Sequence, residues 1–203
     1  MTTAGLALAL LATYVVLALV VRPILQLRRT GSTGVVTVRK HTSASEWAAV
    51  LLGLAGFGLA FTAPALVLLD IVDLAEWHDS TPLRAAGAVT MVAGIVLTFA
   101  AQLAMGASWR IGVDPSERTA LVTDGLFGWI RNPIYTGMVL TVGGLVLLLP
   151  TVVAVAALAT VVAAVEVQVR LVEEPYLRQV HGDEFAAYCR RVGRLLPKVG
   201  RQR

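Results

Sequence analysis

Long apolar segments are the feature that most limits how this chain can fold. Three of them are each about as long as the roughly 20 helical residues needed to cross a bilayer: residues 4–21, 47–69 and 84–105. Two shorter segments, 134–149 and 151–169, are separated by Pro150. We therefore predict an all-α integral membrane protein with about five transmembrane helices. The last two should form a C-terminal helical hairpin with Pro150 at its tip.

The composition is typical of a membrane protein that forms one helical unit. Hydrophobic residues make up 57% of the 203 residues and charged residues only 15%, against roughly 25% in soluble domains. The length leaves no room for a separate soluble domain of useful size. The single cysteine, Cys189, excludes an internal disulfide framework and a cysteine-rich metal site.

The distribution of basic residues predicts the orientation in the membrane. Of the 17 Lys and Arg residues, 16 lie within residues 22–46, 106–133 and 170–203, while residues 70–83 have none. The positive-inside rule therefore places the N-terminus outside and the C-terminus in the cytoplasm. No basic residue precedes the first apolar segment, so we expect a retained anchor in the cytoplasmic membrane rather than a signal peptide.

Polar residues gather in three clusters, which all lie on the cytoplasmic side in this topology. The first, residues 105–135, mixes aromatic and polar side chains and ends with Asn132 as N-cap and Pro133 at the first helical position. A connection of this length is usually functional or disordered, and its aromatic residues argue against disorder. An aromatic belt at the membrane interface is the alternative interpretation.

The second cluster lies where the last apolar segment ends. Arg170, Glu173 and Glu174 share one face of a helix, and ionisable residues in a span usually face a partner or a wet cavity. The alternative is a ladder of ion pairs at the helix end, formed by Glu166, Arg170 and Glu174. Pro175 should kink the helix or start a new one.

The third cluster, residues 181–198, predicts a cytoplasmic amphipathic helix. Phe185, Tyr188 and Val192 lie on one face, and the arginines at 190, 191 and 194 lie largely off it. Attraction to anionic lipid is enough to explain the arginines, but it does not explain Tyr188.

In chain order these clusters read LVTDGLFGWIRNPIYTG, EEPYL, HGDEFAAY and RLLP. The ordered set resembles the isoprenylcysteine carboxyl methyltransferase family, which is related to membrane phospholipid methyltransferases, and the resemblance covers residues 105–197. The apolar segments before it predict N-terminal transmembrane helices with three spans over residues 1–104. A methyltransferase-like catalytic region, with the helical hairpin and a cytoplasmic tail, would follow over residues 105–203.

The resemblance implies an integral membrane enzyme that uses S-adenosylmethionine to methylate a lipophilic isoprenoid or lipid acceptor, with its cofactor site on the cytoplasmic side. The cofactor-binding residues implied by the family pattern or by their place beside it are Thr119, Ala120, Leu121, Val122, Phe127, Arg131, Asn132, Pro133, Ile134, Tyr135 and Glu173. Asn132 replaces the family's histidine, and His181 replaces a phenylalanine. Arg170 lies one residue away from the position of the arginine that holds the substrate carboxylate in the family.

The chemistry of S-adenosylmethionine agrees with these positions. Glu173 or Glu174 can pair with its ammonium group, and the start of the helix at Pro133, with Arg131 nearby, suits its carboxylate. Methyl transfer is an in-line displacement that depends mainly on positioning. The candidate catalytic residues are Glu174, Tyr188 and Arg170. An amine acceptor needs a base, for which Glu174 and Tyr188 are the candidates, whereas a carboxylate acceptor needs none.

Two other functions stay open. An NADPH-dependent reductase of a sterol or isoprenoid lipid would share the Arg-x-Pro-x-Tyr-x-Gly element, and a non-enzymatic membrane scaffold would leave Glu173 and Glu174 without a purpose. We expect no metal and no nucleic acid as partners. His41 and His181 have no partner at metal-ligand spacing, and His78 lies in an acidic loop for which a solvated surface is favoured over a metal site. The identity of the methyl acceptor and the oligomeric state stay open.

Overall fold

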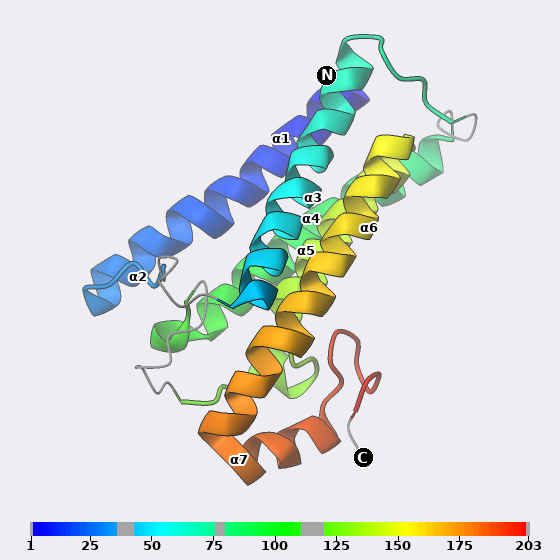
Figure 1. Cartoon of the computed structure of the whole chain (residues 1–203). Coiled ribbons are helices and arrows are strands. Elements are labelled where there is room, and N and C mark those ends of the chain that lie inside the picture. The colour runs from blue at the N-terminus through cyan, green and yellow to red at the C-terminus, as the bar shows by residue number, and fades with distance from the viewer. Residues whose placement is uncertain (1, 36–42, 76–79, 111–119, 202–203) are drawn as a thin grey trace.

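The computed structural model describes residues 2–35, 43–75, 80–110 and 120–201. The predicted site residue Thr119 lies outside these ranges. The main helical elements are α1 (Thr3–Val15), η1 (Val16–Val21), α2 (Arg22–Thr30), α3 (Ala44–Leu68), α4 (Thr81–Ala104), α5 (Pro133–Leu148), α6 (Val152–Val167), η5 (Gln168–Glu173) and α7 (Glu174–Arg191). Consecutive elements join, so that α1, η1 and α2 form one continuous helix. Elements α6, η5 and α7 follow one another in a second long helix that bends sharply within α7 (Figure 1).

Four of the described helices are long and apolar enough to cross a membrane: Thr3–Thr30, Ala44–Leu68, Thr81–Ala104 and Val152–Arg191. The apolar helix α5 is shorter, with 16 residues. The predicted all-α membrane fold is confirmed, and the exact number of spans stays a prediction. The predicted hairpin is present, because α5 ends two residues before Pro150 and the hydroxyl of Thr151 accepts the N–H of Ala154 to start α6.

Two helices run further than the sequence predicted. The first helix was expected to end at residue 21 and continues to Thr30. The last was expected to end at residue 169 and continues to a kink at Gly182, beyond which α7 runs to Arg191. In both, a π-helical segment, η1 or η5, lies near the expected end. Pro175 falls in the first turn of α7, directly after η5, where the helical hydrogen bonds already change register. The backbone instead breaks at Gly182 (φ 49°, ψ −121°), a conformation that glycine tolerates.

Helices α4 and α5 pack with their backbones in contact. A Cβ atom built on Gly137 would lie 2.6 Å from the carbonyl oxygen of Gly94, and one built on Gly144 would lie 2.7 Å from that of Gly87. Small residues allow this approach, which supplies van der Waals packing where lipid offers no hydrophobic driving force between helices. This close packing fixes where α5 begins relative to the end of α4.

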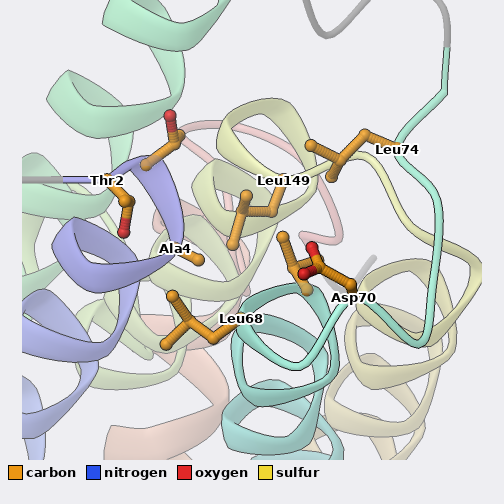
Figure 2. A pocket seen from close by; sticks show the side chains of 8 residues that line it. Thr2, Ala4, Leu68, Asp70, Leu74 and Leu149 are labelled. Atoms are coloured by element: carbon orange, nitrogen blue, oxygen red, sulfur yellow. The ribbon is translucent and has the colours of Figure 1, made fainter.

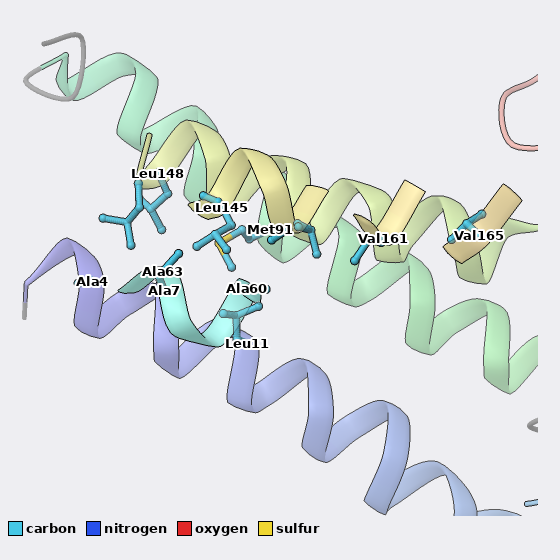
Figure 3. Packing of buried hydrophobic residues seen from close by; sticks show 14 of the residues in the cluster. Ala4, Ala7, Leu11, Ala60, Ala63, Met91, Leu145, Leu148, Val161 and Val165 are labelled. Carbon is cyan, nitrogen blue, oxygen red and sulfur yellow. The ribbon is translucent and has the colours of Figure 1, made fainter. Parts of the chain in front are cut away.

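The main hydrophobic core lies between the long helices (Figure 3). Leu11, Met91, Leu145 and Val161 come from four different helices and are fully buried there. Large apolar side chains also point outward, and Leu54 is 68% exposed. Such a surface is typical of helices that face lipid.

We predict that Gly144→Ala lowers the free energy of unfolding by about 1–3 kcal/mol, because the added methyl group meets backbone atoms of α4 that cannot move aside. Unfolding of the detergent-purified protein would measure the loss. Gly53→Ala on α3 is the matched control, since nothing lies within 4 Å of a Cβ atom there. Equal stability of the two variants would contradict the close contact.

Candidate functional site

Three parts of the chain meet at the end of the bundle where α7 lies (Figure 1). They are residues 120–132 of the connection between α4 and α5 (residues 105–132), α7, and the C-terminal tail (residues 192–201). The hydroxyl of Tyr188 on α7 donates to the backbone oxygen of Phe127 in the connection at 2.6 Å. Leu121 packs against the same buried cluster, which contains Phe185, Cys189 and Val192. The apolar face that the sequence assigned to the third cluster therefore packs within the protein.

The C-terminal tail is hydrogen-bonded to the start of α5. The backbone N–H and the side-chain amide of Asn132 both donate to the carbonyl oxygen of Arg194, at 3.1 Å. The hydroxyl of Thr136 donates to the carbonyl oxygen of Leu195 at 2.7 Å. Asn132 thus occupies the N-cap position and Pro133 follows it as predicted, but the Asn132 side chain holds the tail instead of capping the helix.

Tyr135 and Glu173 lie side by side although they come from different helices. The Tyr135 hydroxyl donates to Oε1 of Glu173 at 2.5 Å, and the side-chain amide of Gln168 donates to the same oxygen at 3.1 Å. The second oxygen of Glu173, Oε2, accepts no hydrogen bond from the part of the chain that the structure describes. This pair joins the start of α5 to the helix that returns from the hairpin, and both residues belong to the predicted cofactor-binding set.

Glu174, the next residue, takes part in a buried ion cluster. Its carboxylate accepts from Arg194 at 2.7 and 3.0 Å and from Arg131 at 3.2 Å, and Arg178 lies 3.8 Å away. Arg131 and Glu174 are each only 6% exposed. Arg131 also donates to the carbonyl oxygen of Gly200 at 3.0 Å. The cluster therefore ties together the connection, α7 and the C-terminal tail.

Among the residues that the structure describes, the ion cluster carries more positive than negative charge. Two arginines with little exposure, Arg131 and Arg194, share the single carboxylate of Glu174. The hydrogen bond to that carboxylate raises the pKa of Arg194. Nε of Arg131 is buried and has no hydrogen-bond partner among the described residues. A buried donor without a partner is costly, so this atom is a candidate contact for a bound anionic group.

The other predicted residues lie around this centre. Ala120 is exposed, Leu121, Val122 and Ile134 are partly buried, and Phe127 is buried. Arg170 forms an ion pair with Glu166, and its side chain is 55% exposed. Glu174 is paired elsewhere, so the ladder considered from the sequence forms only in its first half. The structure therefore brings Tyr188 and Glu174 to the site but turns Arg170 outward.

Three residues at the site were not anticipated. Gln168 lies five residues before Glu173, a spacing that joins two side chains only where the helix is π-helical. The one sequence signal was a polar amide within an apolar segment. Arg194 and Thr136 were hidden for another reason, because their partners are distant in the sequence or are backbone atoms.

A pocket of about 310 Å³ lies at the other end of the bundle (Figure 2). Apolar side chains such as Leu68, Leu74 and Leu149 line it, and Thr2 and Asp70 add polar groups. It contains none of the predicted site residues. Within the described ranges, no three His, Cys, Asp or Glu side chains are grouped as metal ligands would be.

Comparison with curated proteins finds no significant match. Among solved structures, the chain is similar to a eukaryotic intramembrane Ras methyltransferase, isoprenylcysteine carboxyl methyltransferase, with a TM-score of 0.59 and 22% sequence identity. The match covers 90% of this chain and 62% of that one, so the chain spans less than two thirds of the length of this structural relative. At this identity the likeness establishes a shared fold.

A comparison with models of protein families identifies the family to which the chain belongs. Residues 83–184, half of the chain, match the model of the phospholipid methyltransferase (PEMT) family. The matched range includes α5, the ion cluster's Arg131 and Glu174, and the Tyr135–Glu173 pair. This chain therefore belongs to the phospholipid methyltransferase family.

Proposed function

We propose that the chain is an S-adenosylmethionine-dependent methyltransferase that acts on a lipophilic isoprenoid or lipid acceptor. The observation that carries this proposal is the junction of Tyr135 and Glu173 beside the connection and the C-terminal tail. Family membership supplies the reaction class, and the arrangement of charges supplies the fit to the cofactor. The positive-inside pattern supports a cytoplasmic location for this end of the bundle, on the side where the cofactor would be dissolved.

Glu173 is suited to hold the ammonium group of the cofactor. Its Oε1 accepts from Tyr135 and Gln168, which fixes the carboxylate and leaves Oε2 available. A charge-assisted hydrogen bond from an ammonium group to that oxygen is stronger than a neutral one. Glu174 is a poorer candidate for the same role, because its carboxylate already pairs with Arg131 and Arg194.

The carboxylate of the cofactor fits the positive side of the site. The N-terminus of α5 carries a partial positive charge, and Arg131 lies two residues before its first residue. The buried Nε of Arg131 lacks a partner, and two arginines share one acidic residue beside it. Negative charge would therefore be stabilised here, whereas Glu173 would stabilise positive charge.

When bound, S-adenosylmethionine would supply an electrophilic methyl group on its sulfonium. An acceptor that attacks this methyl group in line takes it, and the sulfur leaves as a neutral thioether. The residues of the chain then act mainly by orientation and exclusion of water. Tyr188 holds the carbonyl of Phe127, and Glu174 holds the C-terminal tail, so both position the walls of the site. A role as general base remains part of the proposal only for an amine acceptor.

The acceptor should reach the site from the bilayer. Large apolar side chains cover the outward faces of the long helices, as lipid contact requires. Arg170 points outward beside Glu166 at the same end, where it is placed to meet an acidic acceptor group as the family resemblance implies. A carboxylate acceptor would need no base, whereas a phospholipid amine would.

We predict that the detergent-purified protein binds S-adenosylmethionine with a micromolar-range dissociation constant, because opposite charges flank the site. Isothermal titration calorimetry would measure it. Saturable binding of NADPH, with none of S-adenosylmethionine, would instead support the reductase. Binding of neither would support the scaffold.

We predict that Glu173→Gln weakens cofactor binding about tenfold to a hundredfold, since a hydrogen bond to a charged group contributes roughly 1.5–3 kcal/mol. The fold should persist, because the amide can still accept from Tyr135. Glu184→Gln, an exposed acid on α7, is the control with unchanged affinity. Unaltered binding by Glu173→Gln would remove this residue from the site.

We predict that Glu174→Gln lowers the free energy of unfolding by about 3–5 kcal/mol, because it leaves Arg131 and Arg194 buried without a counter-charge. Glu166→Gln, which breaks the exposed pair with Arg170, should change it by no more than about 1 kcal/mol. Chemical unfolding in detergent would compare the two. Similar losses in both variants would argue that the buried cluster does not hold the site together.

A further inference from the structure

Arg22 is a fully buried arginine in the N-terminal helix, at the junction of η1 and α2. It has no carboxylate partner in the described part of the chain. A buried charge of this kind is unfavourable unless other groups replace the water it has lost. Its surroundings therefore need an explanation that the proposed cofactor site does not provide.

Backbone carbonyls in the last turn of α4 and in the short 3-10 turn that follows it (Gly106–Ser108) replace the missing counter-charge. Nε of Arg22 donates to the carbonyl oxygen of Gln102 at 3.0 Å, and one terminal nitrogen donates to that of Gly106 at 2.7 Å. The other terminal nitrogen donates to Gln26, whose amide donates in turn to the carbonyl oxygen of Ala107 at 2.9 Å. The last carbonyls of a helix lack partners and carry partial negative charge, so the guanidinium caps α4 from another helix.

Trp109 extends this contact into the connection. The guanidinium carbon of Arg22 lies 4.4 Å from the centre of the Trp109 ring, and the ring is only 2% exposed. Gly34 lies against the same residue, because a Cβ atom built there would be 2.9 Å from the Trp109 carbonyl oxygen. Arg22 and Gly34 both belong to the N-terminal part of the chain, which thus fixes the place where the connection leaves α4.

The π-helical segment η1 takes part in the same junction. The amide of Gln102, which is 5% exposed, approaches the carbonyl oxygen of Ala18 within η1 at 3.5 Å. A π-helical segment frees or shifts backbone acceptors, and such segments are frequent at functional sites. The N-terminal helix therefore contacts the end of α4 through side chains and backbone alike.

We propose that Arg22 is a positioning residue for the methyl transfer, which acts by fixing the start of the connection. The inference rests on the proposed function, because the far end of the connection carries Phe127, Arg131 and Asn132. The far end is held by α7 and the tail, and the start is held by Arg22 and Gln26. The N-terminal helix is then part of the working site and not only an anchor.

The test compares Arg22→Gln with Arg28→Gln, an exposed arginine on the same helix. Arg22→Gln should raise the dissociation constant for S-adenosylmethionine about tenfold, as coupling from a distant contact does. It should also speed amide hydrogen exchange within residues 103–110 while leaving exchange in α3 and α6 unchanged. Arg28→Gln should change neither readout.

Each result decides the proposal. Unchanged affinity in Arg22→Gln, or faster exchange throughout the bundle with unchanged affinity, would overturn it. If Arg22→Gln does not fold, Gln26→Leu decides in the same way, because it removes the donor to Ala107 and leaves the charge. If the unmodified protein binds no S-adenosylmethionine, the proposed function fails by itself. Local exchange in residues 103–110 then still supports or overturns the positioning by Arg22.

Discussion

The buried carboxylate of Glu174 holds together the three parts of the chain that form the candidate site. It accepts from Arg131 at the end of the connection and from Arg194 in the C-terminal tail, and it lies on α7 itself. Inside a protein such a pair resists separation, because either partner alone would leave an uncompensated charge. The positions of Asn132, Thr136 and the start of α5 all follow from this contact, since the tail is hydrogen-bonded to them.

Glu173 and Glu174 are adjacent in the sequence but have different partners, because the helix points their side chains in different directions. Successive side chains of a helix point about 100° apart, so Glu173 faces Tyr135 on α5 while Glu174 faces the arginines. The π-helical turn before them brings Gln168 onto the same carboxylate as Tyr135. The carboxylate of Glu174 is thereby occupied by ion pairs, and that of Glu173 keeps one oxygen that accepts no hydrogen bond from the described residues.

The sequence was sufficient for the helical membrane fold and the hairpin at Pro150, and it named both Tyr135 and Glu173 as members of one site. These depend on apolar length and on an ordered set of motifs, both of which are local in the sequence. The partners of Glu174 and the role of Gln168 were not predictable, because the first depends on a tail that folds back and the second on a π-helical register. The division at residue 104 and the cofactor contacts stay predictions.

The connection between α4 and α5 is held by two different kinds of interaction. The end of the connection is held by the ion pair between Arg131 and Glu174. Its start is held by the guanidinium of Arg22, which donates to backbone carbonyls instead of to a carboxylate. The family match begins at residue 83 and therefore includes the carbonyls of Gln102 and Gly106 but not Arg22. Every residue has a backbone carbonyl whatever its side chain. The sequence of the matched region therefore does not indicate that Arg22 donates to these two carbonyls. Only the folded arrangement identifies the N-terminal helix as the element that completes them.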